Sequence, residues 1–186
     1  LAKSGKIGNI VSIDATCTST KELENQISTY ERRNSICAWG PTALLPVLQL
    51  LGTEYEKIDS SSYFMSDNDA FDLFTKINFN YKNAVASIKV GKGVKAEGNL
   101  VIAGTKGYIY VPAPWWKTDY FEIRYENQEE NKRYFYQLDG EGIRYQIVAF
   151  IKSIENKQSN SYISRELSEQ ICTIIEGWNE KKKKSQ

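Results

Sequence analysis

Residues 99–116 read NLVIAGTKGYIYVPAPWW. Residues 99–103 and 108–111 are rich in side chains that favour strands, and Gly104-Thr105-Lys106-Gly107 between them is a turn sequence. The stretch therefore predicts a β-hairpin.

Similar β-rich runs and turns lie on both sides of this hairpin. By the same criteria we expect two further hairpins and two single strands: residues 73–79 with 84–90, residues 120–126 with 133–138, residues 7–18 and residues 55–64. Successive hairpins imply a largely antiparallel sheet.

Three segments predict helices. Residues 41–51 (PTALLPVLQLL) are apolar nearly all round, which indicates a buried helix that begins at Pro41 and stops at Gly52. Two amphipathic helices follow near the end of the chain, and each must cover its stripe against the sheet or against the other. The stripes are Ile143, Ile147, Phe150, Ile151 and Ile154, then Leu167, Ile171, Ile174, Ile175 and Trp178 with Ser164 as N-cap.

The order of these elements predicts one α+β domain over residues 1–180. Residues 20–34 are polar and predict either a short exposed helix or a loop, while residues 181–186 predict a frayed basic tail. Leu-Ala-Lys-Ser-Gly at the start is typical of a last helical turn stopped by Gly5, and Met65 is the only methionine. We therefore expect residues to precede Leu1 in the full-length protein.

Composition narrows the functional classes. The net charge is +1, which favours neither nucleic acid nor an anionic membrane, and no apolar run reaches the roughly 18 residues of a membrane span. Three well-separated cysteines predict buried thiols in a reducing cytoplasm rather than disulfides or a zinc site. The sequence contains no histidine, which removes the commonest general base and metal ligand.

Phosphate-binding loops are absent from the sequence. Gly91-Lys92-Gly93 lacks the frame of a P-loop and predicts a turn, and no GxGxxG follows a strand. We therefore expect this chain to hold no dinucleotide by itself.

The adjacent Trp115 and Trp116, followed by Lys117, are the most informative polar-aromatic group. One indole can face the core while the other forms a platform for a sugar ring, although plain packing is the alternative for both. Trp39 is a similar case, just ahead of the buried helix, whose first backbone N–H groups are candidates to meet a ligand oxygen.

Three stretches together resemble the C-terminal domain of the Gfo/Idh/MocA family of NAD(P)-dependent oxidoreductases, which act mainly on sugars and polyols. They are the opening SGKIGNI (residues 4–10), IAGTKGYI with VPAPWW (residues 102–116), and GEGIRYQI (residues 140–147) leading into a helix. The resemblance implies an open, mostly antiparallel sheet with helices on one face, as in dihydrodipicolinate reductase and the C-terminal domain of glucose-fructose oxidoreductase. It also implies a preceding Rossmann domain that carries NAD or NADP and a catalytic lysine, so that this piece alone is inactive and binds no cofactor.

The family's catalytic Asp and His positions correspond to Ala38 and Thr42 in this sequence. Thr42 can bind a substrate hydroxyl but has no pKa near neutrality. The resemblance places a sugar cleft at Arg33, Trp39, Thr42, Trp115 and Trp116, and a homodimer interface on the open face of the sheet. Two alternatives remain open: a non-catalytic ligand-binding or assembly module of the same fold, and a free-standing β-rich binding protein.

Overall fold

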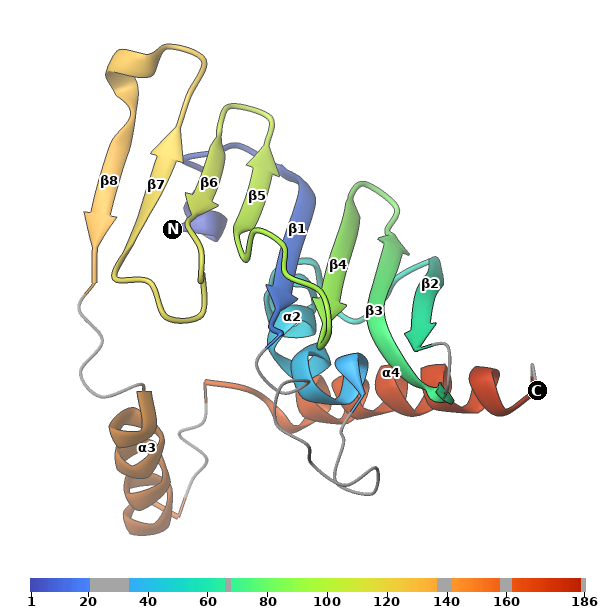
Figure 1. Ribbon diagram of the computed structural model, residues 1–186. Coiled ribbons are helices and arrows are strands. Elements are labelled where there is room, and N and C mark those ends of the chain that lie inside the picture. The colour runs from blue at the N-terminus through green and yellow to red at the C-terminus, as the bar shows by residue number, and fades with distance from the viewer. Residues whose placement is uncertain (21–33, 66–67, 137–141, 158–161, 185–186) are drawn as a thin grey trace.

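An eight-stranded open sheet organises the chain in the computed structural model, which describes residues 1–20, 34–65, 68–136, 142–157 and 162–184 (Figure 1). The strands are β1 (Ile10–Thr18), β2 (Lys57–Met65), β3 (Asn68–Asn80), β4 (Val85–Gly91), β5 (Leu100–Gly104), β6 (Tyr108–Val111), β7 (Tyr120–Arg124) and β8 (Lys132–Phe135). The helices are α2 (Ser35–Leu51), α3 (Ile143–Glu155) and α4 (Arg165–Lys184), with short 3-10 turns η1 (Ala2–Ser4) and η2 (Gln128–Glu130).

The order of strands across the sheet is β2-β3-β4-β1-β5-β6-β7-β8. The pair β1/β4 is parallel and the other neighbouring pairs are antiparallel. This confirms the three predicted hairpins (β3/β4, β5/β6, β7/β8) and the α+β fold class. Between β1 and β4 the chain passes through α2, β2 and β3. This long connection allows β4 to lie beside β1 in the same direction.

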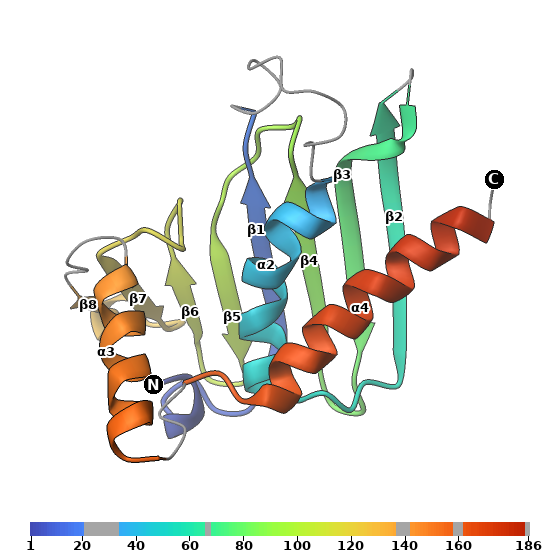
Figure 2. The same ribbon diagram turned by 90° about the horizontal axis from the view of Figure 1, so that it is seen from below.

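Helices α2 and α4 lie over one face of strands β1–β4 (Figure 2). The core between these layers is apolar and includes Ile13, Cys17, Leu44, Val47, Phe79 and Ile88. The stripe predicted for the last helix is largely buried there, through Leu167, Ile171, Ile174 and Trp178. No helix among the described residues is long and apolar enough to cross a membrane.

Helix α2 begins at Ser35 rather than at the predicted Pro41. The side chain of Asn34 caps it by accepting a hydrogen bond from the Cys37 N–H (2.9 Å), and Gly52, at φ 90°, ends it by donating to the Leu48 carbonyl (3.0 Å). Sequence reasoning took Pro41 as the first turn and missed this cap.

Helix α3 does not cover its apolar stripe, which corrects the expectation from sequence. None of its residues is buried, and Ile143, Ile147, Phe150, Ile151 and Ile154 are 59%, 53%, 67%, 47% and 61% exposed. The reason is its position: α2 and α4 occupy the β1–β4 half of the sheet, whereas α3 stands apart from both in Figures 1 and 2.

The two ends of the chain were only partly predicted. Gly5 is left-handed (φ 78°) and ends η1, as expected, and Ile7 is fully buried. At the other end α4 continues to Lys184, where the sequence predicted a frayed tail from Lys181. Residues 21–33, which contain most of the predicted exposed helix or loop, lie outside the described residues.

Candidate functional site

A hollow of about 440 Å³ opens where β1 ends. It is lined by four segments that are far apart in the sequence, with the residues Thr18, Ser19, Thr20, Trp39, Lys95, Pro114, Trp116 and Lys117. The strand β1, the helix α2 and the two loops after β4 and β6 each contribute side chains.

Two tryptophans form the apolar wall of this hollow. The rings of Trp39 and Trp116 lie 4.9 Å apart between centroids, at an interplanar angle of 50°. Gly98 leaves room for Trp116, since a Cβ there would lie 3.1 Å from the indole ring. Tilted indoles of this kind offer a flat apolar surface with a polar N–H at its edge.

Trp115 takes a different position from Trp116. It packs against the core, and its indole Nε1 is buried without a hydrogen-bond partner among the described residues. The neighbouring Cys17 is also buried, and burial raises the pKa of its thiol to about 12 despite the opposing influence of the Trp115 indole. Cys17 is therefore a neutral packing group rather than a nucleophile.

The charged side chains that line the hollow are both lysines. Lys95 is positioned by the loop after β4, because Thr18 exchanges hydrogen bonds with the N–H (3.0 Å) and C=O (3.1 Å) of Ala96. Lys117 is positioned by a tight turn in which its N–H donates to the Pro114 carbonyl (2.8 Å). The described lining thus combines aromatic surface with positive charge, which suits a ligand with an anionic group.

The other residues predicted for the site are not part of this lining. Ala38 and Thr42 lie one turn apart on α2 and are partly exposed. Arg33 lies outside the described residues. Sequence reasoning did not single out Lys95, because its place beside Trp39 depends on the β1/β4 pairing and carries no local signal.

Two of the first N–H groups of α2, those of Ser35 and Cys37, are bonded within the protein. The Ser35 N–H donates to Asp72 Oδ1 (2.9 Å), the Ser35 hydroxyl donates to the Asp72 carbonyl (2.6 Å), and Thr75 donates to Asp72 Oδ2 (2.5 Å). These bonds leave fewer N–H groups at the start of α2 to meet a ligand oxygen, and the expectation that this helix start binds one stays a prediction.

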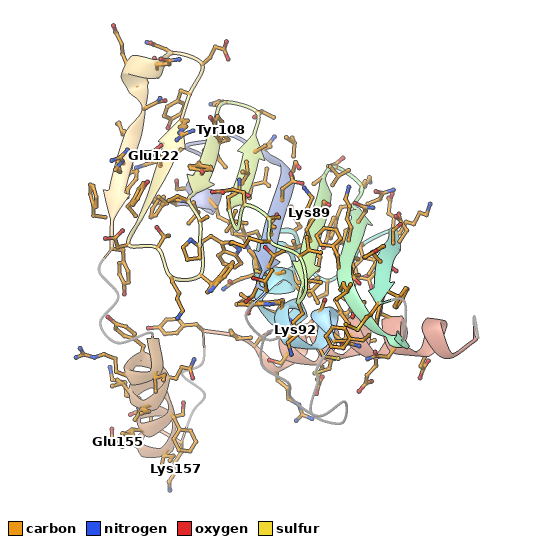
Figure 3. All side chains as sticks on the ribbon, viewed as in Figure 1. Lys89, Lys92, Tyr108, Glu122, Glu155 and Lys157 are labelled. Atoms are coloured by element: carbon orange, nitrogen blue, oxygen red, sulfur yellow. The ribbon has the colours of Figure 1, made fainter. Side chains whose placement is uncertain are left out.

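Lys92 lies beside this cluster, next to α2 (Figure 3), and burial lowers the pKa of its ammonium group. Its backbone N–H donates to the Ser35 hydroxyl (3.0 Å), which ties the end of β4 to the start of α2.

Among the residues that the structure describes, we find no group that fits the phosphates of a dinucleotide cofactor. The sequence has no glycine-rich phosphate turn, and the Ser35 and Cys37 N–H groups in the first turn of α2 are bonded within the protein. Within the described residues there is also no group of three or more His, Cys, Asp or Glu side chains that could hold a metal.

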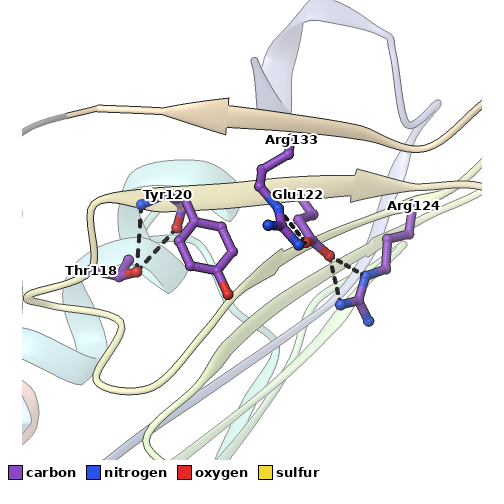
Figure 4. A network of polar contacts seen from close by, with 5 residues as sticks. All are labelled: Thr118, Tyr120, Glu122, Arg124 and Arg133. Atoms are coloured by element: carbon purple, nitrogen blue, oxygen red, sulfur yellow. Dashed lines mark hydrogen bonds and ion pairs between the residues drawn. The ribbon is translucent and has the colours of Figure 1, made fainter.

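A second polar cluster lies on the open face of the sheet. Glu122 pairs with Arg124 and with Arg133, each at 2.6 Å (Figure 4). The hydrogen bond from Arg124 is the main reason that the pKa of Glu122 is lowered, and Arg133 adds to it. Arg124 also lies over the Tyr110 ring (4.5 Å) and Arg133 over the Tyr120 ring (4.8 Å).

This cluster faces away from α2 and α4. Tyr110 pairs with Glu122 across β6/β7, whereas the alternating Ile109 and Ile123 are buried on the helix side. Sequence analysis missed the cluster because the register of β7 with β8 brings Arg133 to Glu122.

Several solved structures with a similar fold are described as oxidoreductases that bind NAD or NADP. A mutant of the 3-ketoreductase KijD10 from Actinomadura kijaniata, in complex with TDP-benzene and NADP, matches 92% of this chain with a TM-score of 0.72 and 14% identity. An NAD-binding oxidoreductase from Klebsiella pneumoniae matches 92% with a TM-score of 0.75 and 13% identity. An oxidoreductase from Agrobacterium radiobacter, in complex with NAD+, L-tartaric acid and magnesium, matches 94% with a TM-score of 0.71 and 14% identity.

The chain spans about half of each of these proteins: 52%, 56% and 55% of their lengths. No protein-family model and no curated protein sequence matches it. At this level of identity the likeness establishes the fold, which is the α+β fold shared with NAD(P)-binding oxidoreductases.

Proposed function

We propose that this chain is the substrate-binding half of an NAD(P)-dependent oxidoreductase whose substrate is a sugar or sugar derivative with an anionic group. The observation that carries the proposal is the hollow in which Trp39 and Trp116 meet between Lys95 and Lys117. The shared fold supports the reaction class, and the lining supports the substrate class.

The lining suits both parts of such a substrate. The C–H faces of a sugar ring pack on indole rings, while Lys95 and Lys117 neutralise a phosphate or carboxylate. Ser19 and Thr20 add hydroxyl groups that exchange hydrogen bonds with ring hydroxyls.

The cofactor, NAD or NADP, belongs in this proposal to a separate Rossmann domain of the full-length protein, since the sequence has no glycine-rich phosphate turn. That domain also supplies the group that moves the proton. Thr42 on α2 binds and orients a hydroxyl but does not titrate near neutral pH.

A second candidate function rests on Ala38 and Thr42 standing where the resembled family has Asp and His. In that reading the full-length protein binds a sugar and assembles, without catalysing hydride transfer. Turnover of NAD(P)H or NAD(P)+ by the full-length protein with any member of a broad panel of polyols and keto sugars excludes this candidate.

We extend the proposal to a homodimer formed through the open face of the sheet. Tyrosine and arginine are enriched in protein interfaces, and Tyr110, Tyr120, Arg124 and Arg133 gather on this face. Three cysteines without disulfides fit a reducing compartment such as the cytoplasm.

The substrate class is tested by calorimetric titration of the full-length protein with glucose 6-phosphate, glucuronate, UDP-glucose and glucose. We expect an anionic sugar to bind more tightly than glucose. Replacing both lysines (Lys95→Ala with Lys117→Ala) removes that preference by weakening anionic binding about tenfold or more, since each charge-assisted contact is worth about 1.5–3 kcal/mol. Lys82→Ala, an exposed turn lysine away from the hollow, is the control and leaves binding unchanged. Equal affinity for glucose and the anionic sugars contradicts the substrate class.

A further inference from the structure

Helix α3 presents a continuous apolar face that no described part of the chain covers. Its five stripe residues recur at helical spacing on one side, and all of them are exposed: Ile143, Ile147, Phe150, Ile151 and Ile154. Lys152 lies on the opposite side of the helix, and Glu155, labelled in Figure 3, lies beside the stripe.

An isolated amphipathic helix of this length is not stable by itself in water. Helices of about 12–15 residues depend on burial of an apolar face, because their intrinsic propensity barely offsets the cost of nucleation. Here the five large side chains remain in solvent on a helix of 13 residues. A partner surface that covers them is therefore part of the folded state of α3.

The position of α3 limits what that surface is. Both α3 and the N-terminus lie at the β5–β8 end of the molecule, in two perpendicular views (Figures 1 and 2). The N-terminal segment runs on the helix side of the sheet, where Lys6 donates to the Tyr134 hydroxyl (3.1 Å) and Ile7 is fully buried. A domain attached ahead of Leu1 would therefore begin on the helix side of the sheet. Beneath β6–β8 this side is not covered by α2 or α4.

We propose that the apolar face of α3 docks onto the cofactor-binding domain of the full-length protein, an inference that rests on the proposed function. The NAD(P)-binding proteins of the same fold have about half of their length outside the matched region, which is enough for such a domain. Helix α3 then acts as the joint that fixes the orientation of the two halves. A second copy of this chain is the competing occupant of the same face.

Hydrogen–deuterium exchange of the full-length protein tests this docking, with the peptide that covers residues 143–155 as the readout. We expect the α3 amides of the wild type to exchange at least about tenfold more slowly than those of Phe150→Asp, because the carboxylate opens the docked face. Tyr145→Asp, on the opposite side of the same helix, is the aromatic-to-acid control and leaves the wild-type protection in place. Ile147→Ser is the milder second variant, with a smaller acceleration in the same direction, and retained protection in β1 and β4 verifies that each variant is folded.

The docking proposal is overturned by either of two exchange results, or by a failure of nucleotide binding. One is wild-type α3 amides that exchange as fast as those of Phe150→Asp. Another is α3 protection that rises with protein concentration, since a second copy then covers the face. Titration with NADH and NADPH on the same samples separates this failure from that of the proposed function: nucleotide binding with an unprotected α3 overturns the docking alone. Absence of nucleotide binding overturns the proposed function, and with it the cofactor domain as the occupant.

Discussion

Asp72 shows how a single side chain fixes an element that lies far from it in sequence. Its carboxylate accepts from the Ser35 N–H and from the Thr75 hydroxyl, and all three residues are fully buried. Buried polar groups destabilise a protein when they lose their partners, so each member of this cluster depends on the others. The cluster holds the first turn of α2, and thereby Trp39, against β3.

The first prediction concerns this residue. Asp72→Ala leaves the Ser35 N–H and the Thr75 hydroxyl without their acceptor, and we expect it to lower the free energy of unfolding by about 3 kcal/mol. Asp59→Ala is the matched control, because Asp59 is exposed and accepts one hydrogen bond from Asn78 (3.0 Å). Urea unfolding of the full-length protein measures both, and equal losses in the two variants contradict the role of Asp72.

The second prediction is a pH dependence at Glu122. Its folded pKa is lowered, mainly by Arg124, from an ordinary value of 4.5. The stabilisation from this ionised carboxylate is therefore present above pH 4.5 and is lost as the pH falls through the folded pKa. Glu122→Gln is expected to cost about 1 kcal/mol at pH 7, and the difference from wild type shrinks below pH 4.5. Unfolding free energies at pH 3–7 measure this, and a difference that is constant over the range argues against it.

At the scale of elements, the distance between two backbone segments decides whether a glycine can be replaced by a larger residue. Gly104 ends β5 where the N-terminal segment crosses it, and a Cβ there would lie 2.1 Å from the Ile7 carbonyl oxygen. Gly177 lies within α4, and a Cβ there meets nothing within 4 Å. The same residue type therefore serves packing in one element and weakens the other.

The third prediction compares these two glycines. Gly104→Ala is expected to destabilise the protein by about 3 kcal/mol or more, because the backbone of residue 7 has to move out of the core. Gly177→Ala is expected to stabilise it by up to about 1 kcal/mol through helix propensity. Thermal unfolding of both variants gives the two signs, and a stabilising Gly104→Ala contradicts the close contact with Ile7.

Local sequence predicted most elements but not their long-range partners. The hairpins were predictable because turn residues and β-rich runs are adjacent in the chain, and the apolar stripe of α4 followed from its spacing. The start of α2 was not, because its partner Asp72 is 37 residues away from Ser35. The apolar stripe of α3 was identified correctly. Whether other elements cover it depends on where α3 lies in the fold, which its own sequence does not encode.

The candidate site was predictable to a similar extent. Trp39 and Trp116 were candidates because they are aromatic. Their contact, however, requires α2 and the loop after β6 to meet in the fold. Lys95 carried no signal, since only the pairing of β4 with β1 brings it to the hollow. Glu122 and its arginines were missed for the same reason, as strand register is not encoded by either strand alone.

For the whole molecule, helices α2 and α4 cover one face of the sheet over β1–β4, and the other face is open. The open face carries the aromatic and charged cluster around Glu122, and the helix face leaves α3 uncovered at its end. The partners proposed for these two surfaces are a second copy of the chain for the open face and a cofactor domain for α3.

The fourth prediction tests the open face. Sedimentation of the full-length protein is expected to give a dimer, and Tyr110→Asp raises the dimer dissociation constant about tenfold or more, as removal of a central interface aromatic does. Lys82→Asp, in the exposed turn between β3 and β4, is the control and leaves the dimer intact. A monomeric wild type at micromolar concentration excludes this interface.

Titration of the full-length protein with NADH and NADPH, followed by nucleotide and tryptophan fluorescence, tests whether the protein depends on NAD(P). We expect saturable binding of at least one of the two nucleotides at micromolar to millimolar concentration, the range of typical enzyme KM values. Full-length protein that binds neither nucleotide contradicts the proposed function as part of an NAD(P)-dependent oxidoreductase.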